Sequence, residues 1–284
     1  MAIKKKPLKR PEAVAEGRLN TLDPVVDLAI GLANDALGKR DDAERHVSAA
    51  EQGWHASLDP QLLHLTAGNL AGKRGDLVEA ERRYRLADTT EGSGRARFGL
   101  AEVVYQRAGC GAGSVDPVAL GEAEQRYRAA GQAGHPPEAH LEERSAFGLG
   151  RVHVCLGQAG FERRWTDAER ELSRVTDAFV AGKGDLRELA SEAYALRAIV
   201  ALPAPGEIAP ERRLRHAETH ARRAVELAVD STRRGVHFGQ LGFVLGELGQ
   251  REEARAAYLQ AAELDTARAD EYQQRATELD IPAD

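Results

Sequence analysis

A pair of glycines seven residues apart occurs four times along this chain, each time ahead of a stretch with one small–large–small pattern. The clearest copy is residues 235–268, GVHFGQLGFVLGELGQREEARAAYLQAAELDTAR. In this copy Phe238, Leu241, Gly242 and Leu245 share one helical face, because steps of three and four residues return to the same side of a helix. The first half of the copy is therefore predicted to be an amphipathic helix.

A second helix is expected after Gly249, with Ala254, Tyr258 and Ala261 on one face. Glycine is the usual residue where a helix ends in a left-handed conformation. The copy therefore predicts a helix–turn–helix hairpin. Small residues such as Gly242 let the two helices approach closely, and the large ring of Tyr258 fills a wider gap.

The same hairpin recurs along most of the chain at a period near 34 residues. The four glycine pairs are Gly31–Gly38, Gly68–Gly75, Gly150–Gly157 and Gly242–Gly249. We expect repeats at about 24–57, 61–94, 95–136, 143–182, 188–231 and 235–268. Six small–large–small stretches in one register are hard to explain by chance.

This pattern resembles the tetratricopeptide repeat (TPR), whose signature is W-x2-L-G-x2-Y, then A-x3-F, then P. The chain departs from it at Phe238, which replaces Trp, and at Thr266, which replaces Pro. The resemblance implies an all-α fold, a right-handed α-solenoid of about six hairpins over residues 23–268. Residues 269–284 would form a capping helix and tail, with Tyr272, Ala276 and Leu279 turned toward the last repeat.

Composition agrees with a globular helical protein: 42% of the 284 residues are hydrophobic and 30% are charged. Cys110 and Cys155 are too few for a disulfide framework or a thiol metal site. No apolar run is long enough to cross a membrane, and the N-terminus lacks the apolar segment of a signal peptide. A cytoplasmic location is the expectation.

The net charge of −6 hides an asymmetry, because the first ten residues carry five basic side chains and no acidic one. We interpret residues 1–22 as a flexible basic arm, most simply a solvated tail. Contact of the arm with nucleic acid or an anionic membrane surface is not expected, but it remains an alternative.

Three consecutive hairpins have widened turns between their two helices. The extra residues lie between Gly109 and Ala123, between Gly157 and Ala168, and in the loop Pro203–Pro210. Insertions at one position of a repeat lie along one edge, which is often a binding face. Phe161 and Trp165 are the candidate partner contacts on this edge, and simple drift in exposed turns is the alternative.

No catalytic motif emerges. The glycine-rich stretch 109–113 has neither a preceding strand nor a following Gly-Lys-Ser/Thr, so it does not indicate a nucleotide loop. His216 and His220 are one helical turn apart, but no third metal ligand is evident, and a solvated helix face is favoured. We therefore expect no enzyme activity, no cofactor and no metal.

The resemblance also implies that the first helix of each hairpin lines a concave groove. The candidate groove contacts are Leu65, Asn69, Lys73, Val103, Gln106, Arg107, Phe147, Arg151, Tyr194 and Phe243. Lys73, Arg107 and Arg151 make the centre basic, which favours an acidic or acidic–apolar peptide, although ordinary solvation of these charges is an alternative.

One known use of such a groove is not supported by the residues. In the chaperone-tail-binding members of the family, a Lys/Asn/Arg clamp holds a terminal carboxylate. Asn69 fits one clamp position, but Leu65 and Gly148 replace the lysine and the arginine. That function is therefore not assigned.

The expected function is a non-catalytic scaffold or adaptor that binds a peptide or partner protein through the groove or through the edge with the insertions. The alternative is a regulatory module whose basic arm contacts nucleic acid or an anionic surface while the repeats bind a partner. Homo-oligomerisation is left open.

Overall fold

The computed structural model describes residues 23–55, 59–88, 93–110, 115–133, 139–202 and 211–279. The expectations for the basic arm 1–22, the loop Pro203–Pro210 and the glycine-rich stretch lie wholly or mostly outside these residues. Within them the chain forms thirteen α-helices and no β-strand, so the predicted all-α repeat fold is confirmed.

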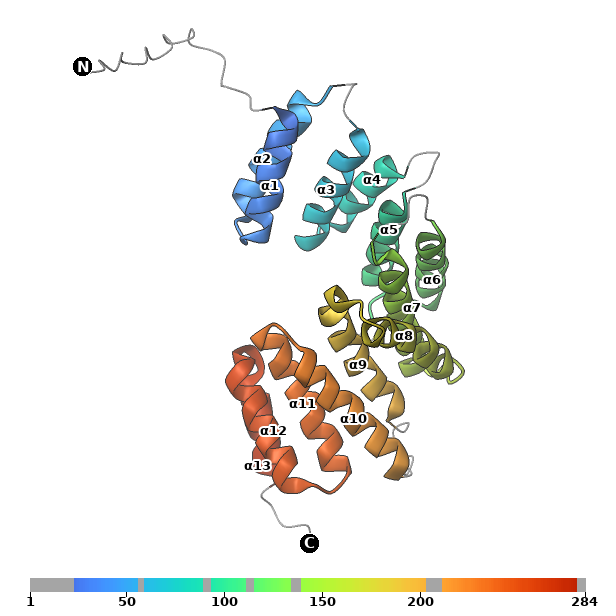
Figure 1. The fold of residues 1–284 in the computed structure, drawn as a ribbon, viewed down its shortest axis with the longest axis vertical. Helices are drawn as coiled ribbons and strands as arrows, with labels where there is room; N and C mark the ends of the chain where they lie inside the picture. Colours follow the sequence, from blue (N-terminus) through green and yellow to red (C-terminus); the bar gives the residue numbers. More distant parts are fainter. Residues whose placement is uncertain are drawn as a thin grey trace, which may run out of the picture. The chain divides into compact units, whose positions relative to one another are not determined.

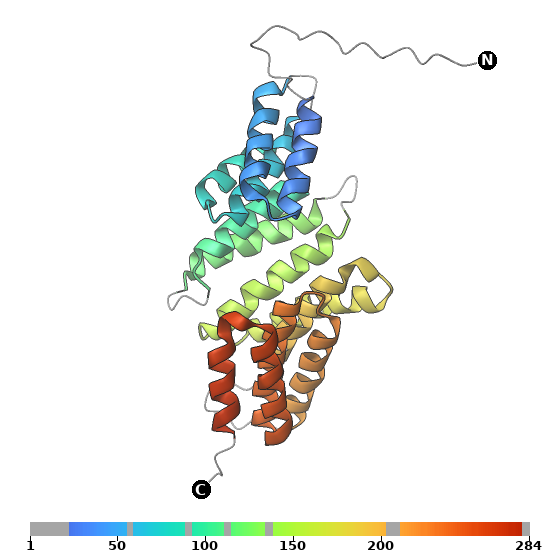
Figure 2. The ribbon, with the colours of Figure 1, turned by 90° about the vertical axis from the view of Figure 1, so that its left-hand side faces the viewer.

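The chain divides into two compact units, residues 1–87 and residues 88–284. The N-terminal unit contains two antiparallel hairpins (Figures 1 and 2). Its helices are α1 (Pro24–Ala36), α2 (Arg40–Gly53), α3 (Pro60–Lys73) and α4 (Leu77–Ala87).

The C-terminal unit contains four hairpins and a closing helix (Figure 1). Its helices are α5 (Gly94–Arg107), α6 (Pro117–Gln132), α7 (Leu141–Gln158), α8 (Arg164–Val180), α9 (Arg187–Ala201), α10 (Glu211–Leu227), α11 (Ser231–Glu247), α12 (Arg251–Leu264) and α13 (Ala269–Glu278). Two single-turn 3-10 helices, Gly184–Leu186 and Thr266–Arg268, precede α9 and α13.

Aspartate followed by proline starts three of these helices. The carboxylates of Asp23, Asp59 and Asp116 each accept a hydrogen bond from the backbone N–H two residues on, at 2.8–2.9 Å. These bonds satisfy N–H groups that the first turn of a helix leaves unpaired, and the following proline has no N–H to satisfy.

The turn glycines follow the prediction in three of the four pairs and depart from it in the fourth. Gly38, Gly75 and Gly249 have φ angles of 73°, 79° and 73°, which favour glycine. Gly157 instead lies within α7, and Gly160, with φ 95°, follows that helix. The prediction that Gly157 is the turn residue is therefore wrong.

Residue 157 is a glycine for a different reason. A Cβ atom placed there would lie 2.6 Å from the ring of Trp165, which lies in the first turn of α8. The indole ring occupies the space that a side chain at residue 157 would need. Trp165 thus packs into the fourth hairpin, against the core cluster formed with Leu172 and Val175.

Large side chains of the second helices pack over glycines of the first helices, as the repeat pattern predicts. A Cβ atom at Gly68 would lie 2.8 Å from the Tyr84 ring, and one at Gly242 would lie 3.0 Å from the Tyr258 ring. These glycines allow the helix axes to approach, and any larger residue would displace the ring.

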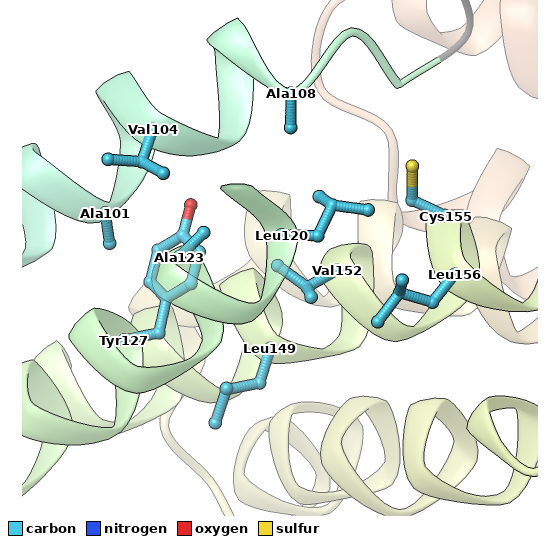
Figure 3. Close-up of a cluster of buried hydrophobic side chains, with 10 residues drawn as sticks. All are labelled: Ala101, Val104, Ala108, Leu120, Ala123, Tyr127, Leu149, Val152, Cys155 and Leu156. Atoms are coloured by element: carbon cyan, nitrogen blue, oxygen red, sulfur yellow. The ribbon is translucent and has the colours of Figure 1, made fainter. Parts of the chain in front are cut away.

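In the third hairpin Glu102 stands at the position of that first-helix glycine, and its carboxylate accepts a hydrogen bond. Tyr127 is fully buried, and its hydroxyl donates to a carboxylate oxygen of Glu102 at 2.6 Å. Its ring packs on Gly148, where a Cβ atom would lie 2.4 Å away. Figure 3 shows Tyr127 within the cluster of buried side chains, beside Ala101 and Val104 of α5.

Cys110 and Cys155 form a disulfide, which the sequence analysis did not expect. Their Cα atoms are 5.9 Å apart, and the residues are 45 positions apart in the chain. The bond joins the segment after α5 to α7, where Cys155 is buried beside Leu120 and Leu156 (Figure 3). Two cysteines in different hairpins reveal no such pairing until the hairpins are stacked.

The last helix, α13, closes the C-terminal unit. Tyr272 and Ala276 are buried against α12, and the partly buried Leu279 packs with them, in agreement with the sequence analysis. The exposed side chains of α13 are Asp270, Glu271, Gln273, Gln274, Arg275, Thr277 and Glu278. All of them are polar, as expected for a helix whose outer face meets water.

Candidate functional site

A hollow of about 680 Å³ lies in the C-terminal unit, between one face of α7 and one face of α9. We call it the α7–α9 hollow. It is lined by Ala139, His140, Arg144, Phe147, Arg151, Asp185, Leu186, Glu188, Leu189, Glu192 and Arg233. A concave space of this size is large enough for several side chains of a bound peptide.

The α7 wall is built from residues that helical spacing places on one face. His140, Arg144, Phe147 and Arg151 follow one another at steps of four, three and four. This wall therefore alternates basic side chains with one aromatic ring.

The α9 wall is acidic, and a basic residue of α11 offsets part of its charge. Arg233 lies 2.6 Å from a carboxylate oxygen of Glu188 and 3.3 Å from one of Glu192. Burial raises the pKa of Glu192 above its ordinary value, although the nearby Arg233 opposes the shift. Leu189 lies between the two glutamates and supplies apolar surface.

The side chain of Arg151, which lines the hollow, is held in place by Glu102 and Tyr105. Its guanidinium donates to Glu102 at 2.9 Å and stacks on the Tyr105 ring, with 4.2 Å between the guanidinium carbon and the ring centroid. Desolvation lowers the pKa of Arg151, but the Glu102 carboxylate together with Tyr127 and Tyr105 outweighs that effect, and the net shift is upward. Arg151 is therefore a permanently charged, internally paired residue.

Arg144 differs from the other charges of the hollow. Its side chain is exposed and has no hydrogen-bond or ion-pair partner among the residues that the structure describes. His140, one turn earlier, forms an ion pair with Asp185. The His140 backbone has φ 60°, in the left-handed region that residues other than glycine rarely adopt.

The structure brings together Phe147 and Arg151, two of the ten groove residues expected from the sequence. Tyr194 lies elsewhere, because its ring stacks on His220 of α10 with 5.9 Å between centroids. Val103 is only 2% exposed, so it packs in the interior instead of lining a surface. Gln106 and Arg107 are exposed near the end of α5, and Phe243 is exposed on α11.

Two of the three expected groove residues of the N-terminal unit, Asn69 and Lys73, already bond to neighbouring side chains. Asn69 accepts a hydrogen bond from the Tyr84 hydroxyl at 2.8 Å. The Lys73 ammonium lies 2.5 Å from a carboxylate oxygen of Asp35, and Leu65 is half-buried. Lys73 and Arg151 are thus both paired within the chain, and a role of these residues in binding an acidic partner stays a prediction.

The edge with the insertions keeps one exposed aromatic residue. Phe161 is 48% exposed, whereas Trp165 is half-buried over Gly157. Only Phe161 is therefore available as an aromatic contact there.

Sequence reasoning missed Arg144, Glu188 and Glu192. The signal for Arg144 was present, because it precedes Phe147 by three residues and Arg151 by seven on the same helical face. The two glutamates belong to the fifth hairpin, whose weak repeat pattern gave no reliable register for α9.

A second hollow, of about 450 Å³, is lined by Val200, Ala201, Glu169 and the α10 face that carries His216 and His220. Burial lowers the pKa of His220 to about 4, so its imidazole is neutral at neutral pH. His220 is half-buried, unlike the solvated position expected for it. No group of three metal-ligating side chains occurs in the part of the chain that the structure describes.

Comparison with solved structures identifies the fold. A tetratricopeptide repeat protein from Parabacteroides merdae matches with a TM-score of 0.58, over 91% of this chain and 86% of that chain, at 12% sequence identity. BtubC (BKLC) from P. vanneervenii matches with a TM-score of 0.49, over 92% of each chain, at 16% identity. A thermophilic TPR protein from Thermus thermophilus matches with a TM-score of 0.32, over 90% of this chain and 98% of that chain, at 19% identity.

No family model matches the chain, and no curated protein matches it. The chain is an all-α repeat protein with the tetratricopeptide-repeat fold, as its glycine spacing indicated. None of the helices in the described ranges is long and apolar enough to span a membrane.

Proposed function

We propose that this chain is a non-catalytic protein-interaction module that binds a peptide segment of a partner in the α7–α9 hollow. The observation that carries the proposal is Arg144, a guanidinium without a partner among the described residues, beside the aromatic ring of Phe147. A partner carboxylate would complete an ion pair with Arg144, and an adjacent apolar side chain would lie against Phe147 and Leu189.

The paired charges of the hollow support selectivity. Arg233 is paired with both Glu188 and Glu192, so it offsets one of their two negative charges, and Arg151 is paired with Glu102. Because Arg151 and Arg233 already have carboxylate partners, an acidic group of the partner would pair with Arg144, and a basic group would be repelled by it. The preference for an acidic–apolar segment is thus proposed from Arg144, in place of Lys73 and Arg107.

The fold supports this class of function, because helical repeat arrays present extended surfaces to partner proteins. It does not by itself assign a partner. The cytoplasmic location remains a prediction, and the Cys110–Cys155 bond weighs against it, since structural disulfides are rare in the reducing cytosol.

A displayed library of random peptides, about ten residues long, tests the proposal because it presumes no partner. Selected peptides should combine a carboxylate with a neighbouring apolar side chain. Binding to the wild-type chain, measured by fluorescence anisotropy, should weaken about tenfold or more in Arg144→Glu, because a charge-assisted hydrogen bond is replaced by repulsion.

Arg163→Glu is the matched control, since Arg163 is an exposed arginine just before α8 and outside the hollow. Phe161→Ser tests the edge with the insertions in the same assay. If the peptides lose affinity for Phe161→Ser but not for Arg144→Glu, the binding surface is the edge with the insertions. That result would contradict binding in the α7–α9 hollow.

A further inference from the structure

The second hollow, of about 450 Å³, has a wall of three nitrogen-bearing side chains on α10. Arg212, His216 and His220 line it, and steps of four residues place them one after another on the same face of the helix. The last turn of α9 supplies apolar surface through Val200 and Ala201. We call this space the α10 hollow. It shares no lining residue with the α7–α9 hollow.

The other charged groups that line the α10 hollow are paired within the chain. Glu169 of α8 lies 2.5 Å from the guanidinium of Arg197 in α9. The guanidinium of Arg213 donates a hydrogen bond of 2.7 Å to the carbonyl oxygen of Leu202, at the end of α9. The carboxylate of the lining is thus neutralised by a neighbour, and it does not offset the charge of the α10 wall.

Arg212 and His216 have no such partner. Both side chains are exposed, and neither forms a hydrogen bond or an ion pair with the residues that the structure describes. The His220 ring lies against Tyr194, with 5.9 Å between centroids, and its nitrogen atoms also have no hydrogen-bond partner in the described part of the chain. The wall therefore keeps one permanent positive charge and two imidazoles for a ligand.

The surroundings of His220 disfavour a further positive charge. Burial, followed by the nearby Arg197 and His216, lowers the pKa of His220 to about 4. Groups that disfavour a cation at this wall favour a bound anion. A metal cation would be repelled by Arg212, and the described residues contain no group of three metal-ligating side chains.

We propose that the α10 hollow binds a small organic anion, in which a carboxylate or phosphate group is attached to an apolar or aromatic body. The anionic oxygens would accept hydrogen bonds from Arg212, His216 and His220. The apolar body would lie against Val200 and Ala201. A space of about 450 Å³ is within the range of small-molecule sites. This ligand is distinct from the partner peptide proposed for the α7–α9 hollow.

Imidazole NMR spectra of the nitrogen-15-labelled full chain test the proposal, with His216→Gln and His220→Gln used to assign the two signals. The probes are phenyl phosphate and benzoate. Both histidine signals should shift saturably at neutral pH with at least one of them, and the tighter probe distinguishes a phosphate site from a carboxylate site. Inorganic phosphate lacks the apolar body and benzyl alcohol lacks the charge, so each should bind about tenfold more weakly or not at all.

Arg212→Gln should weaken binding of the tighter probe about tenfold or more, because it removes a charge-assisted hydrogen bond. Arg215→Gln is the matched control, since Arg215 is an exposed arginine of α10 outside the hollow. Its affinity should equal that of the wild type. Bound phenyl phosphate, which stays anionic in acid, should also raise the pKa of His220 from about 4, because the anion stabilises the imidazolium.

Four results would overturn the proposal. If neither probe shifts the signals of His216 and His220 saturably, the hollow is not an anion site. Equal affinities in Arg212→Gln and the wild type, or an unchanged pKa of His220, would place the anion elsewhere. Inorganic phosphate that binds as tightly as phenyl phosphate would identify an adventitious ion only. None of these results affects peptide binding in the α7–α9 hollow, which Arg144→Glu tests separately.

Discussion

The N-terminal unit begins with a helix whose exposed face is apolar, whereas the C-terminal unit ends with one whose exposed face is polar. The two units also join their hairpins differently. In the N-terminal unit, ion pairs link α3 and α4 to the first hairpin: Lys73 with Asp35, Arg74 with Glu44, and Arg83 with Glu51. The C-terminal unit adds a disulfide between two hairpins and a closing helix.

From this difference we expect the C-terminal unit to be the more stable of the two. Surface ion pairs contribute little each, and two hairpins are fewer than the roughly three that repeat arrays need to be stable. The C-terminal unit, with more hairpins, also carries the hollow. We therefore expect the N-terminal unit to unfold first.

The largest expected effect is loss of the disulfide. Closing a loop across 45 residues stabilises a protein by about 4 kcal/mol in the chain-entropy model. Cys110→Ser/Cys155→Ser should therefore lower the higher of two calorimetric transitions by about 10 °C and leave the lower one unchanged. A reducing agent should have the same effect on the wild-type chain and none on the variant. Two free thiols titrating in the native wild-type chain would refute the bond.

The second-largest expected effect is loss of the Tyr272 ring, which anchors the closing helix α13. Tyr272 is 5% exposed, and a Cβ atom at Gly239 would lie 2.4 Å from its ring. Tyr272→Ala should cost about 3 kcal/mol in the free energy of unfolding of the C-terminal unit, measured by urea denaturation. Gln273→Ala, at the exposed neighbour, should change it by less than about 0.5 kcal/mol. Equal effects of the two substitutions would contradict the closing role of α13.

Acid should destabilise the C-terminal unit through a buried histidine. His237 of α11 is 3% exposed, and burial lowers its pKa to about 4. The unfolded chain takes up the proton near pH 6.5 and the folded chain only near pH 4, so stability is lost as the pH falls between these values. His237→Gln should remove about 2 kcal/mol of this loss at pH 5, measured as the difference in unfolding free energy between variant and wild type.

In the N-terminal unit burial likewise lowers the pKa of His64, and a second acid-sensitive group is the carboxylate of Glu79. Hydrogen bonds from Arg82 and Arg83 hold the pKa of Glu79 at about 2, below its ordinary 4.5. Stability from this group is present above pH 4.5 and is lost as the pH falls toward 2. Glu79→Gln should therefore flatten the acid limb of the N-terminal transition without changing its behaviour between pH 6.5 and 4.5. An acid limb that is the same in Glu79→Gln and in the wild type would contradict this role of Glu79.

The sequence was sufficient for the fold because the hairpin depends on local spacing. The pairs Gly68–Tyr84 and Gly242–Tyr258 each lie within one repeat, so their packing is visible as a pattern. Gly157 was misassigned because the partner that explains it, Trp165, belongs to an insertion that the pattern does not cover.

The site was harder to predict because it depends on contacts between repeats. Lys73 and Arg151 look free in the sequence, and only stacking reveals that Asp35 and Glu102 neutralise them. The disulfide and the α7–α9 hollow arise in the same way, from residues about 40 positions or more apart. Repeat register places such residues on a face, but it does not determine the pairing of charges across that face.

The smallest expected effect is on the folding of the first hairpin itself. Ala33 is exposed on α1, so Ala33→Glu should change the unfolding free energy of the chain by less than about 0.5 kcal/mol. The same substitution in α13, Ala276→Glu, buries a charge at a residue that is 1% exposed and should unfold the closing helix. Urea denaturation of both variants at low concentration makes the comparison. If Ala33→Glu destabilised the chain as strongly, the exposed face of α1 would already be covered within one chain, and the contrast between the first and last helices would disappear.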